Sequence, residues 1–188
     1  MRSFLSSFVA AACAAVLLAG GPPPAQAQTA ITIGATAPIT GALSSLYSVQ
    51  GKIWDAWTKA QNEAGGIYVK SLNKKLPVKF IYYDDQSDPK TAVKFYERLI
   101  TEDKVDFLLG PPGSPIAFAA STVAERYKVP MLLGAVTDPA IFARHFKYIQ
   151  GMLTPAVDYS SVAFNLFNTK HIKTVALLVE DSLFSHGI

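Results

Sequence analysis

The hydrophobic positions along the chain follow two alternating periods. Short runs rich in apolar and β-branched residues alternate with longer segments whose apolar residues recur every three or four positions. The runs predict strands over 31–37, 78–83, 105–109, 131–134, 147–149 and 174–179. The longer segments predict helices over 47–64, 89–103, 115–127 and 155–168. Strands that alternate with helices indicate an α/β fold with a doubly wound parallel sheet, covered by helices on both faces.

Four predicted helix starts share a dipeptide, in which a capping residue precedes proline. The side-chain oxygen accepts from free N–H groups of the first turn, and proline fits the first helical position because it has no N–H. The pairs are Asp88-Pro89, Ser114-Pro115, Asp138-Pro139 and Thr154-Pro155. The pairs at 114 and 138 follow predicted buried strands. We therefore expect both at the carboxyl edge of the sheet, where open α/β sheets bind ligands.

The first 27 residues have the features of a targeting signal. Arg2 precedes an uncharged apolar run over 4–19, and Ala25-Gln26-Ala27 is typical of a cleavage site. The run is shorter than the roughly 20 apolar residues of a spanning helix, which disfavours an uncleaved anchor. A lipoprotein signal at Cys13 is a weaker alternative because this cysteine lies inside the run. The sequence predicts export and a mature chain in the periplasm.

Composition and motif spacing exclude several functions. Half of the residues are hydrophobic and the formal net charge is +3, which favours neither a disordered chain nor a nucleic-acid partner. Asp84, Asp85 and Asp88 do not have the spacing of a calcium loop. The three histidines are scattered, and no nucleophile with its base is visible. We therefore predict no metal, no cofactor and no enzymatic activity.

The last predicted strand, 174–179, is followed only by a loop and the beginning of a helix. A strand with no later partner exposes unpaired backbone groups. The pattern therefore predicts a fragment, with more of a second domain downstream.

Six motifs occur in the order seen in the leucine/isoleucine/valine-binding proteins, which are type I periplasmic solute-binding proteins of ABC transporters, and the mature chain resembles that family. The motifs are Ile31-Thr32-Ile33-Gly34 with Ala37-Pro38-Ile39-Thr40-Gly41, Glu63-Ala64-Gly65-Gly66-Ile67, Tyr83-Asp84-Asp85-Gln86-Ser87-Asp88-Pro89, Gly110-Pro111-Pro112-Gly113-Ser114, Gly134-Ala135-Val136-Thr137 and Val179-Glu180-Asp181-Ser182-Leu183-Phe184-Ser185-His186-Gly187. The resemblance implies a two-lobed clamp, with residues 28–151 as lobe one and 152–188 as the start of a truncated lobe two.

The resemblance also implies ligand-binding roles. Ser114, in the loop with Gly113, would hold a carboxylate, and its place at a helix start independently favours an anion. The Ala135 carbonyl would accept from an ammonium group, and Thr137 would contact both ligand groups. Phe184 would close over the ligand from lobe two.

Tyr47, next to Leu46, would wall the ligand side chain. The residues alone leave simpler roles open: a helix cap at Ser114, an ordinary loop at 134–138, and a hydrophobic staple at Tyr47.

The family likeness implies an extracytoplasmic receptor that binds an amino acid or related small carboxylate or amide and delivers it to the membrane permease of an ABC importer. The alternative is a ligand-sensing domain of a signalling receptor with the same fold, and an exported α/β enzyme is a third reading. Pro111 and Pro112 depart from the family pattern. Aliphatic amino acids, aromatic carboxylates and amides therefore all stay open as ligands.

Overall fold

The computed structural model describes residues 28–186, so the predicted signal at 1–27 and the last two residues lie outside the described part. Its main sheet has five strands in the order β4-β1-β5-β6-β7, and every neighbouring pair is parallel. The strands are β1 (Ile31–Ala37), β4 (Val78–Asp84), β5 (Phe107–Leu109), β6 (Met131–Leu133) and β7 (Ile149–Gly151). The predicted α/β class is confirmed.

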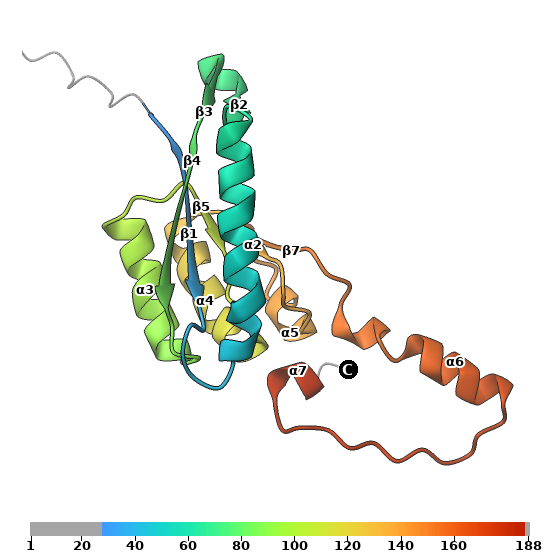
Figure 1. The fold of residues 1–188 in the computed structure, drawn as a ribbon. Helices are drawn as coiled ribbons and strands as arrows, with labels where there is room; N and C mark the ends of the chain where they lie inside the picture. The colour runs from blue at the N-terminus through green and yellow to red at the C-terminus, as the bar shows by residue number, and fades with distance from the viewer. Residues whose placement is uncertain (1–27, 187–188) are drawn as a thin grey trace, which may run out of the picture.

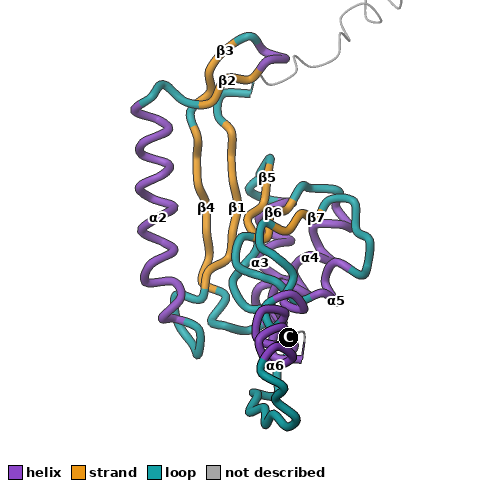
Figure 2. The backbone as a smooth tube through the Cα atoms, turned by 90° about the vertical axis from the view of Figure 1, so that its right-hand side faces the viewer, coloured by secondary structure: helices purple, strands orange, loops and turns teal. Residues whose placement is uncertain are grey.

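Helices cover the two faces of this sheet unequally. Helix α2 (Ser44–Glu63) lies along one side, whereas α3 (Pro89–Thr101) and α4 (Ser114–Tyr127) lie on the other (Figures 1 and 2). Short elements complete the described chain: the antiparallel hairpin of β2 (Ile67–Val69) and β3 (Lys74–Leu76), the 3-10 helices η1 (Lys70–Leu72) and η2 (Ala156–Asp158), and helices α5 (Pro139–Phe142), α6 (Ser161–Thr169) and α7 (Leu183–His186).

Strand β4 shows why the two faces differ. Its side chains alternate in direction, as they do in any strand. Phe80 and Tyr82 pack against Trp54 of α2, with ring centroids 5.1 and 5.8 Å away. Ile81 and Tyr83 instead join the core formed with α3 and α4. The alternation of β4 therefore separates one aromatic cluster under α2 from the main core.

The main core contains one fully buried phenol, that of Tyr96 on α3. Its hydroxyl donates to the carbonyl oxygen of Leu109 over 2.6 Å and accepts from the backbone N–H of Thr36 over 3.2 Å. Both strand groups lie near the carboxyl ends of β5 and β1. The phenol thereby links the two central strands to α3 at the edge where the ligand is expected.

Two of the four predicted caps are confirmed. The Asp88 carboxylate accepts from the backbone N–H of Thr91 over 2.7 Å and begins α3. The Asp138 carboxylate accepts from that of Ala140 over 2.8 Å and begins α5.

The other two predicted caps are wrong. Helix α4 begins at Ser114 itself, because Gly113 adopts a positive φ of 90° and turns the chain into the helix one residue early. Thr154 begins no α-helix. Pro155 has an extended ψ of 144°, so only the short η2 follows it, and α6 starts at Ser161.

The prediction of a strand over 174–179 is also wrong for the described chain. The segment has no regular secondary structure and pairs with no strand among residues 28–186. Leu177 and Leu178 are exposed. Figure 1 shows α6 and the loop after it standing away from the sheet. Without a neighbouring strand the β-rich sequence gains neither ladder hydrogen bonds nor burial. None of the helices in the described part is long and apolar enough to cross a membrane.

Candidate functional site

The strand order creates a crevice at the carboxyl edge of the sheet. The chain pairs β1 with β4 on one side and with β5 on the other, so the winding direction reverses between β1 and β5. Open α/β sheets bind ligands outside the carboxyl ends of their strands at such a switch point. The loops at 110–113 and 134–138 leave β5 and β6 at this edge, and they contain or border Gly113, Ser114, Ala135 and Thr137.

Ser114 has the geometry of an anion-binding residue. It is the first residue of α4 and only 3% exposed, yet its hydroxyl makes no hydrogen bond within the described residues. The first-turn N–H groups of a helix have no partners inside the helix, and the helix dipole is positive there. Because Ser114 does not cap α4, its hydroxyl and these groups are available to a carboxylate.

Gly113 holds the loop before Ser114 against α2. A Cβ atom on Gly113 would lie 2.8 Å from Cδ1 of Leu43, so a larger residue would clash there. The positive φ of Gly113 also disfavours any side chain. Gly113 thus contributes through shape, by allowing the α4 start and the α2 start to meet.

Thr137 places a second unsatisfied hydroxyl at the same edge. Thr137 is 3% exposed, and its Oγ1 is buried without a hydrogen-bond partner. The neighbouring Asp138 uses one carboxylate oxygen as the α5 cap, and its Oδ2 is buried and unpartnered. Ala135, in the same 134–138 loop, is exposed. An unsatisfied buried polar group costs about 1–3 kcal/mol, so these atoms favour a polar ligand group beside them.

A slot opens between α2 and these loops. It has a volume of about 320 Å³ and is lined by Leu46, Val49, Gln50, Ile53, Pro112 and Ala135. The α2 residues of the slot recur with helical spacing and form one face of that helix. Oε1 of Gln50 is buried and has no hydrogen-bond partner in the described chain. The sequence alone did not single out Gln50, because a glutamine in a helix carries no local signal of burial.

Tyr47 does not line this slot. Its ring packs against Gly51, where an added Cβ would lie 2.6 Å from Cε2 of the ring, and its hydroxyl donates to that of Tyr82 over 3.3 Å. This hydrogen bond, together with desolvation, raises the pKa of Tyr47 to about 12. The side chain therefore faces β4, and Leu46 faces the slot instead. Phe184 belongs to α7, and the structure describes its backbone but not its side chain.

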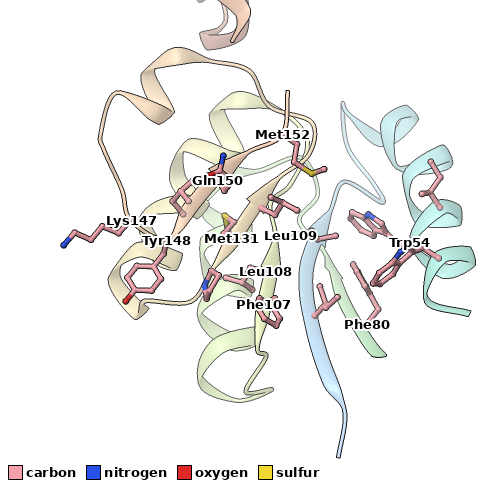
Figure 3. A pocket seen from close by; sticks show the side chains of 16 residues that line it. Trp54, Phe80, Phe107, Leu108, Leu109, Met131, Lys147, Tyr148, Gln150 and Met152 are labelled. Carbon is pink, nitrogen blue, oxygen red and sulfur yellow. The ribbon is translucent and has the colours of Figure 1, made fainter. Parts of the chain in front are cut away.

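A larger groove of about 760 Å³ lies elsewhere, over the face of β5, β6 and β7 on the α2 side (Figure 3). Its lining is mostly apolar and includes Trp54, Trp57, Phe107 and Met152. None of the predicted ligand-binding residues lines it. The faces of parallel sheets are normally covered by other elements. We therefore regard this groove as a bare sheet face and place the candidate site at the carboxyl edge.

The fold is an α/β domain whose parallel sheet has its topological switch point at this edge. A family model described as "Periplasmic binding protein" matches residues 30–188, and the chain belongs to that family. Curated relatives that the chain matches are named as leucine/isoleucine/valine-binding proteins, which agrees with the resemblance seen in the sequence motifs.

Two curated relatives and one solved structure illustrate the likeness. The Leu/Ile/Val-binding protein homolog 3 of Brucella melitensis is 30% identical over 61% of this chain and 29% of its own length. The leucine-, isoleucine-, valine-, threonine- and alanine-binding protein of Pseudomonas aeruginosa is 26% identical over 84% of this chain and 41% of its length. A solute-binding protein of an ABC transporter from Rhodopseudomonas palustris BisB5, solved with 3,4-dihydroxybenzoic acid, is 25% identical. Its TM-score is 0.70, over 85% of this chain and 42% of that one. The chain thus spans less than half the length of these relatives.

Proposed function

We propose that the whole protein is an exported solute-binding receptor of an ABC importer, which binds an amino acid or related small carboxylate or amide. One observation carries the proposal: the hydroxyl of Thr137 is buried without a hydrogen-bond partner at the sheet edge where Ser114 begins α4. Hydroxyl groups without an internal partner are costly to bury unless a ligand satisfies them.

The chemistry of the edge suits a carboxylate. The start of α4 offers free N–H groups, the positive end of the helix dipole and the Ser114 hydroxyl. Thr137 adds a hydroxyl from the next loop, and the Ala135 carbonyl would accept from an ammonium group. No arginine or lysine lines the 320 Å³ slot. The binding energy for the anion would therefore come from fixed dipoles and hydrogen bonds.

The relatives support the same ligand class. The Pseudomonas aeruginosa relative is named for five amino acids, and the Rhodopseudomonas palustris structure holds a dihydroxybenzoic acid. These ligands differ in their side chains or rings and share a carboxyl group. In the whole protein, residues 28–151 would form lobe one, and a second lobe beginning at 152 would close over the ligand, with Phe184 among its contacts. The 1–27 signal would direct the chain to the periplasm, where a permease would recognise the closed form.

Calorimetric titration of the full-length mature protein with amino acids and aromatic carboxylates tests the proposal. Ser114→Ala and Thr137→Val should each weaken binding roughly 10- to 100-fold, as expected for a hydrogen bond to a charged group. Ser71→Ala, an exposed serine in η1, is the control and should bind as the wild type does. Unchanged binding in both site variants would show that the ligand lies elsewhere.

A further inference from the structure

The β2–β3 hairpin has a local concentration of positive charge that the net charge of the chain does not show. Residues 67–79, which we call the basic hairpin, include four lysines and no aspartate or glutamate, whereas the whole chain has 17 lysines and arginines against 14 acidic residues. All four lysines are exposed, and none forms an ion pair within residues 28–186. They are Lys70, Lys74, Lys75 and Lys79.

Two of these lysines also make hydrogen bonds to the backbone. Lys75 Nζ donates to the carbonyl oxygen of Ala64 over 3.0 Å, and Lys74 Nζ donates to that of Gln28 over 3.2 Å. Each ammonium group keeps its charge and has two further donors. The side chains of the other two lysines make no hydrogen bond to the described residues. Those two can therefore be replaced with little effect on the fold.

Exposed apolar side chains lie among the lysines. Tyr68 is 56% exposed and Leu72 is 41% exposed. Tyr68 pairs with Lys75 across the β2–β3 ladder, so their side chains leave the same face. Leu72 belongs to η1, which joins the two strands. A phenol and lysine stems both suit the boundary between water and lipid, because each has an apolar body and a polar end.

The basic hairpin lies at the amino edge of the sheet, opposite the candidate site. Strand β4 begins at Val78, at the end of the hairpin, and Figures 1 and 2 show β2 and β3 beyond the first residues of β1 and β4. Lys74 also contacts Gln28, which directly follows the predicted cleavage site at Ala27. Under the export proposed above, a chain whose signal is still in the membrane would hold this hairpin close to the bilayer surface.

We propose that the basic hairpin is a contact surface for an anionic phospholipid bilayer. An anionic membrane attracts each lysine near its surface, and a cluster of about four is enough for weak binding. The attraction falls off within a Debye length, so charge that is gathered at one end of the molecule is effective where evenly spread charge is not. The inference goes beyond the proposed function, since the contact would hold the receptor at the membrane and leave the carboxyl edge open to ligand.

Vesicle flotation of the full-length mature protein tests the proposal. The vesicles contain either phosphatidylcholine alone or an equal mixture of phosphatidylcholine and phosphatidylglycerol. Wild-type protein should bind the anionic vesicles at least about tenfold more tightly than the neutral ones, and this preference should disappear at about 0.5 M salt.

A matched pair of double variants locates the contact. Lys70→Gln with Lys79→Gln, the hairpin variant, should lower the partition coefficient on anionic vesicles roughly 30-fold, the effect of two lost lysine contacts. The control is Lys90→Gln with Lys94→Gln, which removes the same charge from exposed positions on α3. The control should bind within about threefold of the wild type, because its lysines lie outside the contact.

Several outcomes would overturn the membrane contact. These are no wild-type binding to anionic vesicles, equal binding by the wild type and the hairpin variant, or equal losses in the hairpin variant and the control, which would mean that net charge alone drives binding. Wild-type protein that binds heparin but neither kind of vesicle would show that the surface takes a soluble polyanion instead. Ligand titration is a separate measurement, so a failure of the proposed receptor function would leave a hairpin-dependent flotation result intact.

Discussion

Two stretches of similar sequence differ in structure in this chain: one forms a strand and the other has no regular secondary structure. Strand β1 (Ile31–Ala37) and residues 174–179 are both short, uncharged and rich in β-branched residues. β1 pairs with β4 and β5 and is largely buried. Residues 174–179 pair with nothing in the described chain, and Leu178 is fully exposed.

The difference shows that a β-rich sequence becomes a strand only when neighbours are available. Measured β-propensity mostly reflects cross-strand packing and burial. In the sheet region, residues 28–151, β4 and β5 supply that packing. In the tail region, residues 152–186, α6 buries none of its residues and the following segment is not covered. Local pattern therefore identifies a candidate strand, and tertiary contacts decide whether it forms.

The largest expected contrast between the two regions is in amide hydrogen exchange. In the 188-residue chain, amides of β1 should exchange only through global opening and be protected by a factor on the order of 10³ or more. Amides of 174–179 should exchange within about tenfold of an unstructured peptide, because no acceptor holds them. Exchange read by mass spectrometry measures both segments together. Comparable protection in the two would mean that the tail region is packed in solution.

Truncating one leucine to alanine in each region should show how much side-chain packing contributes to the free energy of unfolding there. Leu108 is buried in the main core, and Leu178 is exposed. Leu108→Ala should lower the free energy of unfolding of the same chain by about 2–5 kcal/mol, through lost burial and a cavity. Leu178→Ala should change it by less than about 0.5 kcal/mol. Urea unfolding followed by circular dichroism measures both, and equal costs would contradict the comparison.

Removal of the buried Tyr96 hydroxyl should have a smaller effect on the free energy of unfolding. Tyr96→Phe leaves the carbonyl of Leu109 and the N–H of Thr36 without their buried partner. We expect a loss of about 1–3 kcal/mol in the free energy of unfolding. The matched variant is Tyr159→Phe in the exposed tail region, which should be neutral to within about 0.5 kcal/mol. A neutral Tyr96→Phe would mean that the phenol does not link β1 to β5.

The smallest expected effect is a pH dependence from Asp85. Burial raises the pKa of this carboxyl above its ordinary value, although Thr36 and the backbone N–H of Ser87 donate to it. Between the ordinary and the raised pKa the folded state binds more protons than the unfolded chain. The free energy of unfolding therefore falls as pH rises through that window.

Asp85→Asn should abolish this decline. The free energy of unfolding of the variant should therefore rise relative to that of the wild type as pH increases above the ordinary carboxyl pKa. Urea unfolding at a series of mildly acidic pH values measures the difference. Parallel curves for the two proteins would show that Asp85 is not the group responsible.

The parts of the fold that depend on local signals could be predicted from sequence. Strand β1 has the predicted bounds, and α3 begins at Pro89 because its Asp88 cap is a local motif. The hairpin of β2 and β3 was missed. Its strands have three residues each, and the lysines at 74 and 75 obscure any alternation. Its turn depends on Asn73, whose φ is 48°.

The candidate site was predictable in position and only partly in detail. Ser114 and Thr137 follow predicted strands, and the order of parallel strands brings such loops to one edge. That Ser114 begins α4 and does not cap it depends on the conformation of Gly113. The unsatisfied amide of Gln50 depends on which groups surround it in three dimensions. No spacing along the chain records such an absence of partners.

The central position of β1 also determines when the sheet can form. Ile31 pairs with Val78, and Ile33 with Phe107. Strand β1 is therefore synthesised first and can pair only after residues far along the chain have been made. Each parallel pairing must close a long loop before any ladder bond offsets the entropy of closure. Folding dominated by such distant contacts is slow. Slow sheet formation would keep the nascent chain open and extended, which is the state that the export proposed above requires.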